Sequence, residues 1–238
     1  MRMIFKLLKW AVSLVLTALI IGAAALSVFA FKGYKMYEEA VKEKPMEQMA
    51  EEIMSREDFT EYEELPEIYK SAVISAEDKR FFSHCGVDLI SIGRALWNDL
   101  KAGAFVEGGS TISQQLMKNQ YFTQEKKLER KFAEIFAALE LEKKYEKEEI
   151  FEMYVSTIYF GSGYYGIAEA AKGYYGKTPE ELSDSEAIML AGLPNAPSAY
   201  SLDSSPELAK QRMRQVLDKM LECETISPEE AESVFAEN

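Results

Sequence analysis

The sequence predicts an all-α domain preceded by one N-terminal transmembrane helix. Three observations favour this fold class: an uncharged apolar run near the N-terminus, helical spacing of the apolar residues that follow, and no convincing pair of strands. The chain has 238 residues, and 47% of them are hydrophobic. This size suits one globular core with an appendage.

The expected membrane anchor occupies residues 1–32. Three basic residues precede an uncharged run from Trp10 to Phe31, and Lys32 follows it. A helix rises about 1.5 Å per residue, so about 20 apolar residues cross the roughly 30 Å hydrocarbon layer, whereas a signal-peptide core has about 7–15. The length therefore favours a retained anchor over a signal with a cleavage site at 28–30. The basic flank predicts a cytoplasmic N-terminus, with the rest of the chain on the outer face of the membrane.

Two regions follow the anchor. Residues 33–61 are dense in Glu, Lys and Met and show weak periodicity, which predicts an acidic stalk with a solvated helical face. From residue 62 onward the periodicity is helical, so residues 62–238 form the predicted globular domain.

Charge and cysteine content exclude several classes of function. The formal net charge of −13 argues against general nucleic-acid binding, because such proteins need basic surface to displace counterions from phosphates. Cys85 and Cys223 lie far apart and lack CxxC spacing, so neither a zinc site nor a disulfide framework is indicated. We expect both to be free thiols.

Apolar spacing and capping residues divide the globular domain into successive helices. Pro66 suits the first turn of a helix that ends near Glu77. Its expected buried face comprises Leu65, Ile68, Tyr69, Ala72, Val73 and Ala76. Further helices are expected after a cap at Asp88, after Ser110 or Thr111, over 128–139 and 150–158, after the capping box Ser183 to Glu186, and after Ser205-Pro206 and Ser227-Pro228. Such an all-helical arrangement places a site in a cleft between helices.

A first group of polar residues begins at the end of the helix that closes at Glu77. Glu77 lies at the edge of the buried face, just before a loop. A partly desolvated carboxyl group has a raised pKa, which suits it to general acid or base work near neutral pH. The alternative is a surface acid without a special role.

A second group spans Gly108 to Asn119, where hydroxyl and amide side chains gather at a helix N-terminus. Free backbone N–H groups and the helix dipole favour an anion there, and paired glutamines suit sugar hydroxyls. The alternative is an ordinary Ser/Thr cap followed by polar surface.

A third group places Lys127, Arg130, Lys131 and Glu134 on one face of the helix over 128–139, opposite its apolar stripe. A salt-bridged solvent face is the simpler interpretation, but basic residues N-terminal to Glu give the less favourable order for pairing. A cationic face beside a carboxylate also suits a pyrophosphate leaving group, whose developing charge needs Arg, Lys or a metal ion.

In this order, the three groups resemble the successive motifs of the glycosyltransferase 51 family, the peptidoglycan transglycosylases. The resemblance runs from about Tyr62 to Ser201 and includes two further blocks, 147–161 and 166–197. It implies a lysozyme-like, two-lobed helical domain whose smaller lobe dips into the membrane. It also implies that residues 62–238 form a peptidoglycan glycosyltransferase domain, which polymerises lipid II by inverting transfer to the acceptor 4-hydroxyl and releases polyprenyl pyrophosphate.

The resemblance assigns roles to individual residues. Glu77 would be the general base, and Glu134 would organise the pyrophosphate directly or through a divalent cation such as Mg²⁺ or Mn²⁺; no other cofactor is expected, and no metal ligands are assigned. The residues expected to bind substrate are Asp78, His84, Ser110, Thr111, Gln114, Gln115, Lys118, Asn119, Lys126, Arg130 and Lys131. We expect the lone His84 to hold Glu77 and its neighbours in place rather than to exchange protons.

Three positions depart from the family pattern. Ser113 replaces a common threonine, Ser156 a usual asparagine, and Lys126 a frequent arginine. Because lysine lacks the bidentate geometry of arginine, the phosphate-binding role of Lys126 is the least secure of the basic assignments.

The resemblance also predicts location and partners. We expect a single-pass protein of the bacterial cell membrane that meets lipid II, the growing lipid-linked glycan strand and other cell-wall synthesis proteins, and no nucleic acid. Trp97, Leu100, Phe105 and Val106 would either contact the outer leaflet or pack in the core. 

The transpeptidase motifs Ser-x-x-Lys and Lys-Thr-Gly of many relatives do not occur in the sequence, so we expect no transpeptidase activity. A lysozyme-like lytic enzyme that cuts glycan, and a non-catalytic cell-wall assembly scaffold, are the alternative functions.

Overall fold

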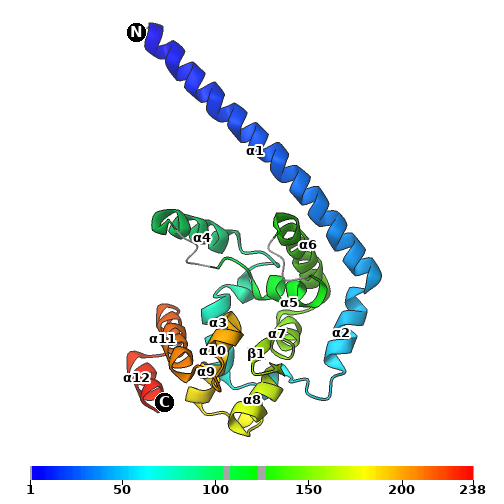
Figure 1. Cartoon of the computed structure of the whole chain (residues 1–238), viewed down its shortest axis with the longest axis vertical. Coiled ribbons are helices and arrows are strands. Elements are labelled where there is room, and N and C mark those ends of the chain that lie inside the picture. The colour runs from blue at the N-terminus through cyan, green and yellow to red at the C-terminus, as the bar shows by residue number, and fades with distance from the viewer. Residues whose placement is uncertain (1, 104–107, 123–126, 238) are drawn as a thin grey trace.

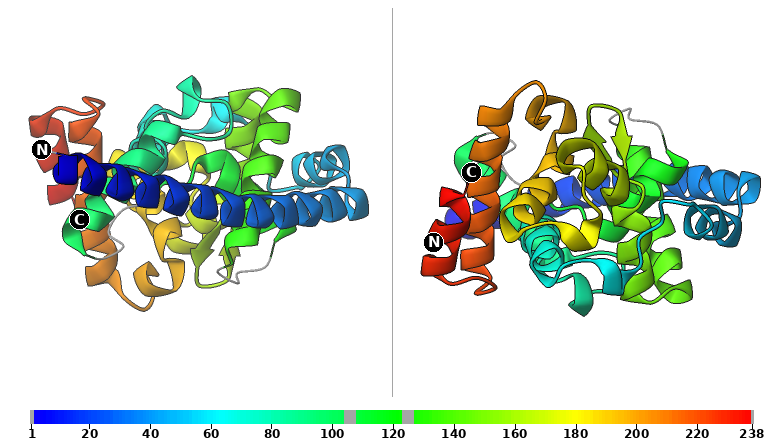
Figure 2. Two further views of the ribbon diagram at one scale, coloured as in Figure 1. Left: turned by 90° about the horizontal axis from the view of Figure 1, so that it is seen from above. Right: turned by 90° about the horizontal axis from the view of Figure 1, so that it is seen from below.

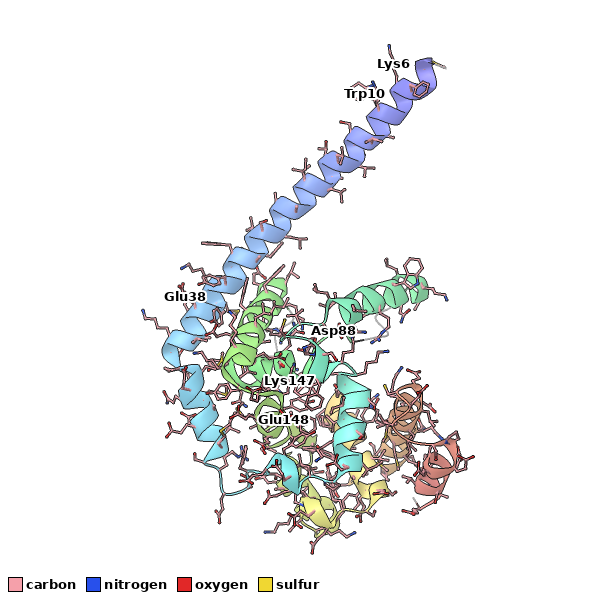
Figure 3. The ribbon with its side chains drawn as sticks, turned by 180° about the vertical axis from the view of Figure 1, so that it is seen from behind. Lys6, Trp10, Glu38, Asp88, Lys147 and Glu148 are labelled. Atoms are coloured by element: carbon pink, nitrogen blue, oxygen red, sulfur yellow. The ribbon has the colours of Figure 1, made fainter. Side chains whose placement is uncertain are left out.

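The computed structural model describes residues 2–103, 108–122 and 127–237. It is helical, as predicted, and its first helix, α1 (Arg2–Glu43), extends well away from the remainder of the chain (Figure 1). Lys6 and Trp10 project from the far end of this helix (Figure 3). The segment from Lys9 to Glu43 is long and apolar enough to cross a membrane, and no part of its apolar stretch is buried.

The C-terminal part of α1 packs along α6 (Leu128–Lys144), so the anchor helix continues directly into the globular domain. The two helices approach closely at Gly33, where a Cβ atom would lie 2.4 Å from Cβ of Phe132. Tyr34 then packs edge-on against Phe136, with ring centroids 5.4 Å apart. Only a glycine permits this crossing without displacement of α6.

The segment predicted as an acidic stalk, 33–61, differs from that prediction. Helix α2 (Met46–Met54) buries Met46, Met49 and Ile53 in the hydrophobic core. These side chains follow helical spacing and share one face. Glu47, Glu51 and Glu52 are exposed on the other face, and the many charged residues of the segment hide this amphipathic pattern in the composition.

The other α-helices and the two strands follow in chain order. They are α3 (Glu67–Glu77), α4 (Leu89–Ala102), α5 (Ile112–Tyr121), α7 (Lys147–Val155), β1 (Tyr159–Gly161), β2 (Tyr164–Tyr165), α8 (Ile167–Tyr175), α9 (Asp184–Gly192), α10 (Pro197–Tyr200), α11 (Pro206–Glu222) and α12 (Pro228–Ala236). Helix α2 and the pair α11 and α12 lie at opposite ends of the domain (Figure 2).

The predicted helix starts are confirmed where a side chain closes the first turn. Asp88 accepts from the N–H groups of Ile90 and Ser91, and Thr111 caps α5. Ser183 and Ser227 form capping boxes at α9 and α12. Each cap satisfies backbone donors that a helix leaves free at its N-terminus.

A short antiparallel pair, β1 with β2, interrupts the helices after α7. Sequence periodicity does not predict it, because strands of three and two residues are too short to show alternation. The turn depends on Gly161, whose φ is +91° and where a Cβ atom would lie 2.6 Å from the carbonyl oxygen of Pro197.

Helix α4 stands apart from the core on the side of the domain that faces the outer part of α1 (Figures 1 and 3). Trp97 is 69% exposed and Leu100 is 80% exposed, so the alternative prediction that these two side chains pack in the core is wrong. Leu89 and Ile90 are exposed on the same helix. Phe105 and Val106, which were predicted together with them, lie outside the described residues.

The core brings the ends of two helices together. Helix α3 packs against α9 and α11, whereas α5 packs against α6 and α7. Large side chains such as Tyr69, Phe81 and Tyr154 are buried between them. The C-terminus of α3 therefore meets α5 in the interior of the domain, and this junction holds the polar residues described next.

Candidate active site

Glu77 is the last residue of α3, and its carboxylate is held from a neighbouring helix. Nε2 of Gln115 donates a 2.8 Å hydrogen bond to Oε2 of Glu77, and Oε1 of Gln115 accepts from the hydroxyl of Tyr154 at 3.3 Å. Nη2 of Arg212, on α11, lies 3.5 Å from Oε1 of Glu77. The Glu77 side chain is 10% exposed. The carboxylate is thus largely desolvated and fixed in orientation, rather than a free surface acid.

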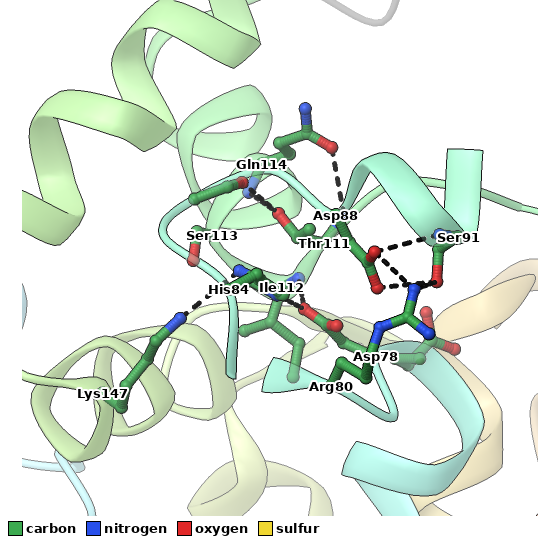
Figure 4. Close-up of polar contacts among 12 residues, drawn as sticks. Asp78, Arg80, His84, Asp88, Ser91, Thr111, Ile112, Ser113, Gln114 and Lys147 are labelled. Carbon is green, nitrogen blue, oxygen red and sulfur yellow. Dashed lines mark hydrogen bonds and ion pairs between the residues drawn. The ribbon is translucent and has the colours of Figure 1, made fainter. Parts of the chain in front are cut away.

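Asp78 and His84 link the loop after α3 to the start of α5 (Figure 4). Oδ2 of Asp78 lies 2.8 Å from Nε2 of His84 and accepts from the backbone N–H of Ile112 at 3.0 Å. Nζ of Lys147 lies 3.4 Å from the other ring nitrogen of His84. This geometry supports the positioning role expected for His84.

Glu142 of α6 completes this buried polar network. It accepts from the Ser113 hydroxyl at 2.5 Å and pairs with Lys147 at 2.7 Å. Sequence reasoning missed Glu142, because one buried acid on a helix with as many basic as acidic residues carries no local signal. Ser113 is one of the three departures from the family pattern, and a second, Ser156, accepts from the backbone N–H of Thr60 and is also buried.

Thr111 and Gln114 form a capping box at the start of α5. The Thr111 hydroxyl also donates to the carbonyl oxygen of Gly86 at 2.8 Å. Gln114 is fully buried, and neither of the two cavities described below reaches it. The Thr111 hydroxyl and the Gln114 carbonyl oxygen therefore stabilise the helix start. Thr111 also borders the smaller cavity, whereas the position of Gln114 gives no support to its expected contact with substrate.

Glu134 lies in the interior and is 2% exposed. Nη1 of Arg130 lies 3.3 Å from its Oε1, and Nζ of Lys131 lies 2.9 Å from its Oε2. Lys131 also donates to the Ser110 hydroxyl at 2.6 Å. The group predicted on an outward face of the helix is thus a buried carboxylate with two cations around it, and a simple solvent-exposed salt-bridge face does not describe it.

Lys118 interacts electrostatically with both carboxylates, Glu77 and Glu134. Burial lowers the pKa of Lys118 below its ordinary value; Glu134 and Glu77 act in the opposite direction, while Arg130 and Lys131 lower the pKa further. Lys118 also borders the smaller cavity together with Glu77 and Ser110, and Lys131, which pairs with Glu134, donates to the Ser110 hydroxyl. Lys118 therefore lies between the Glu77 cluster and the Glu134 cluster.

Two cavities adjoin these residues. One, of about 720 Å³, is bordered by Glu77, Asp78, Ser110 and Arg212. The other, of about 840 Å³, is bordered by Arg56, Tyr154, Tyr159, Tyr165 and Asn119. Gln115, Lys118, Pro194 and Asn195 line both. The cavities thus meet beside the Glu77 carboxylate, an arrangement that leaves room for a molecule on each side of Gln115 and Lys118. Lys126 lies outside the described residues.

The described residues do not fit a divalent cation held by the protein. Among them, no group of three or more His, Cys, Asp or Glu side chains converges on one point. Both oxygens of Glu134 already face Arg130 and Lys131, whereas Mg²⁺ or Ca²⁺ prefers several oxygen ligands. The divalent cation expected at the pyrophosphate stays an untested prediction, and no chemical step below depends on it.

Cys85 and Cys223 are free thiols, as predicted. Cys85 is exposed, and Cys223 borders the smaller cavity.

Comparison with known proteins gives consistent matches over most of the chain. A family model described as transglycosylase matches residues 42–221. Penicillin-binding protein 1A of Neisseria gonorrhoeae is 42% identical over 182 residues, which cover 76% of this chain and 23% of that protein. Penicillin-binding protein 1A of Aquifex aeolicus is 44% identical over 174 residues, covering 73% and 24%. The chain therefore spans about a quarter of the length of these curated relatives.

A solved structure also matches. The crystal structure of penicillin-binding protein 1A from Haemophilus influenzae shares 39% sequence identity and covers 39% of this chain and 14% of that chain, with a TM-score of 0.37.

Proposed function

Because the chain belongs to the transglycosylase family, we propose that it polymerises lipid II into glycan strands by inverting transfer to the acceptor 4-hydroxyl, with release of polyprenyl pyrophosphate. One observation carries this proposal: the two cavities meet at Gln115 and Lys118, beside the Glu77 carboxylate. Joining two large substrates requires adjoining sites with a base between them. A lytic enzyme needs one extended glycan site and water instead.

Glu77 is the general base in this proposal. Gln115 holds its Oε2, whereas Oε1 is buried and accepts no hydrogen bond from the described residues. As the acceptor oxygen attacks the anomeric carbon, its proton passes to the Glu77 carboxylate. The bond from that carbon to the pyrophosphate oxygen breaks, and the electron pair leaves with the pyrophosphate.

The cations around Glu134 stabilise the leaving group. Lys118 lines both cavities, so its ammonium group is placed to bind the pyrophosphate at their junction. Ser110 accepts from Lys131, so its own O–H remains available to a phosphate oxygen in the smaller cavity. Glu134 fixes Arg130 and Lys131 in place and offsets part of their charge.

Two features support a site at the membrane surface. Helix α1 supplies an anchor, and α4, which carries the exposed Trp97 and Leu100, lies on the side of the domain that faces the outer part of α1. We place the N-terminus in the cytoplasm, α4 in the outer leaflet, and the catalytic domain outside the bacterial cell membrane. A lipid-linked substrate then reaches the site without leaving the bilayer.

The proposed activity of residues 1–238 is glycan polymerisation without cross-linking, because these residues contain neither transpeptidase motif. Other cell-wall synthesis proteins remain predicted partners.

Purified protein comprising residues 1–238, in detergent or vesicles and given lipid II, provides the test. Wild type should form polymer and release polyprenyl pyrophosphate, and Glu77→Gln and Glu134→Gln should each reduce the rate by about 100-fold or more. Glu222→Gln is the matched control, since Glu222 borders the same cavity but is exposed and pairs with Lys219. Cleavage of finished glycan without polymer formation would establish the lytic alternative. Full complementation in cells by Glu77→Gln would establish the scaffold.

A further inference from the structure

Arg212 of α11 lies in the site but belongs to none of the polar groups predicted from the sequence. We propose that Arg212 is a positioning residue, which aims Oε1 of Glu77 at the hydroxyl of the acceptor sugar. This inference rests on the proposed function and adds to it the particular oxygen atom that receives the proton.

The two oxygens of Glu77 are in different environments. Oε2 accepts a hydrogen bond from Gln115, so one of its lone pairs is occupied. Oε1 is buried without a hydrogen-bond partner among the described residues, although Glu77 borders the smaller cavity. A buried carboxylate oxygen without a partner costs free energy unless a ligand completes it. Oε1 is therefore the atom that awaits the acceptor hydroxyl.

Arg212 meets Oε1 through charge rather than through a hydrogen bond. Nη2 lies 3.5 Å from Oε1, close enough for an ion pair, yet Oε1 accepts no hydrogen bond from it. The guanidinium thus attracts Oε1 and limits rotation of the carboxylate, while the lone pair stays open to substrate. A shorter, well-aligned hydrogen bond would compete with the incoming hydroxyl.

The guanidinium is itself fixed by the protein. Its Nε donates to the carbonyl oxygen of Gly192 at 3.3 Å, and Nη1 donates to Oε1 of Gln215 at 3.1 Å. The side chain is 13% exposed. Two of its three nitrogens are therefore engaged by protein groups, and the third faces Glu77. This arrangement favours a role through Glu77 over capture of a substrate phosphate.

Gly192 allows α11 to approach α9 this closely. A Cβ atom there would lie 3.1 Å from Cγ of Arg212 and 3.3 Å from Cγ2 of Val216. The end of α9 thus supplies both the space and the carbonyl acceptor that set the Arg212 side chain. The contact joins α11 to the end of α3 across the smaller cavity.

In the proposed step, the acceptor O–H bond breaks and its proton moves to Oε1 of Glu77. The acceptor oxygen forms the new glycosidic bond, and the pyrophosphate departs with the electron pair of the bond that it loses. Arg212 keeps its own proton throughout, because a guanidinium does not deprotonate in proteins. Its contribution is the orientation of the base before the proton moves.

Arg214 provides a matched control on the same helix. It is not among the residues that border the smaller cavity, and it pairs with Glu232 at 2.7 Å and lies over the ring of Phe235 at 3.9 Å from the centroid. Replacing it removes an arginine from α11 without touching Glu77.

The test compares Arg212→Ala, Arg212→Lys and Arg214→Ala in the protein of residues 1–238 with lipid II, by steady-state kinetics and thermal unfolding. For Arg212→Ala we expect kcat to fall by about 100-fold with KM changed by less than about threefold, because misplacing a catalytic group by about 1 Å costs about that factor. Arg212→Lys should fall by about tenfold, and Arg214→Ala should stay within about twofold of wild type. Millimolar guanidinium should restore kcat of Arg212→Ala by about tenfold or more and should not restore Glu77→Gln.

Several results would overturn the inference. The first is a wild-type kcat for Arg212→Ala. The second is a raised KM with unchanged kcat, which would indicate that Arg212 binds substrate. The third is a lost kcat that guanidinium does not restore, which would indicate a structural role. If Arg212→Ala does not fold, a folded Arg212→Lys with wild-type kcat overturns the inference in its place. Failure of wild type itself to form polymer would refute the proposed function instead, so the two failures are distinguishable.

Discussion

The amide of Gln115 holds one oxygen of the Glu77 carboxylate at 2.8 Å, and the Tyr154 hydroxyl in turn holds the carbonyl of that amide. A chain of contacts from α7 through α5 thus fixes the proposed base at the end of α3. The base is oriented from two sides, since Arg212 faces its other oxygen.

Gln115→Leu should release Oε2 of Glu77 while keeping a side chain of similar size. We expect kcat to fall by about 10- to 100-fold, because the carboxylate can then rotate away from the acceptor. Tyr154→Phe, which removes only the distal contact, should have a smaller effect. Steady-state rates with lipid II measure both, and a Gln115→Leu protein as active as wild type would contradict the tether.

Gly33→Leu should push α1 away from α6. The added side chain has no space against Phe132, and overpacking of this kind costs about 1–3 kcal/mol. Because α6 carries Arg130, Lys131 and Glu134, turnover should fall together with the free energy of unfolding. Gly22→Leu is the control, since nothing lies within 4 Å of a Cβ atom at that position. Chemical unfolding and polymerisation rates should separate the two variants.

Trp97 should report insertion of α4 into lipid. In a Trp10→Phe background, Trp97 is the remaining tryptophan, and brominated phospholipids should quench its fluorescence. Trp97→Ser with Leu100→Ser should lower activity in vesicles while leaving the unfolding temperature within a few degrees, because both side chains are exposed. Leu208→Ser alters an exposed apolar residue of α11 and should leave vesicle activity unchanged. Unquenched Trp97 fluorescence would place α4 in water.

Asp88 should make folding stability depend on acid pH. Burial raises the pKa of Asp88, but hydrogen bonds from Arg80 and from the backbone and hydroxyl of Ser91, with the Arg80 charge, hold that pKa below its ordinary value overall. A carboxyl group with a depressed pKa contributes stability above its unfolded pKa of about 3.9, and this stability is lost as pH falls toward the folded pKa.

Asp88→Asn should therefore reduce the free energy of unfolding by about 1–3 kcal/mol at pH 7, through the lost charge at Arg80. The difference from wild type should narrow as pH falls below about 4. Thermal unfolding between pH 3 and pH 7 measures it. A constant difference across that range would show that the Asp88 charge is irrelevant.

Local chemistry explains why much of the fold was predictable. Asp88, Ser183 and Ser227 cap helices through contacts within three residues, and such contacts can be recognised in the sequence alone. The anchor follows from the length of one apolar run. The all-α, lysozyme-like fold class also follows, because helical periodicity and the ordered motifs both indicate it.

Contacts between distant segments could not be predicted in the same way. The apolar face of α2 can be seen in the spacing of Met46, Met49 and Ile53, but its partner in the core cannot. Arg212 reaches Glu77 only because α11 packs against α3, and periodicity shows that a helix has an apolar face without showing what covers it. Burial of Glu134 has the same origin, since the pattern on α6 does not reveal which face meets α5.

The unbroken passage of α1 from its apolar stretch into its contact with α6 has a mechanical consequence. A domain on a flexible tether could rotate freely relative to its anchor. Because α1 contains the apolar stretch and also packs along α6, it holds the domain in one orientation relative to that stretch. Lys32, at the close of the apolar run, pairs with Glu129, the neighbour of Arg130. This pairing ties the end of the apolar run to the helix that carries Glu134, so a tilt of α1 would move the buried Glu134 cluster with it.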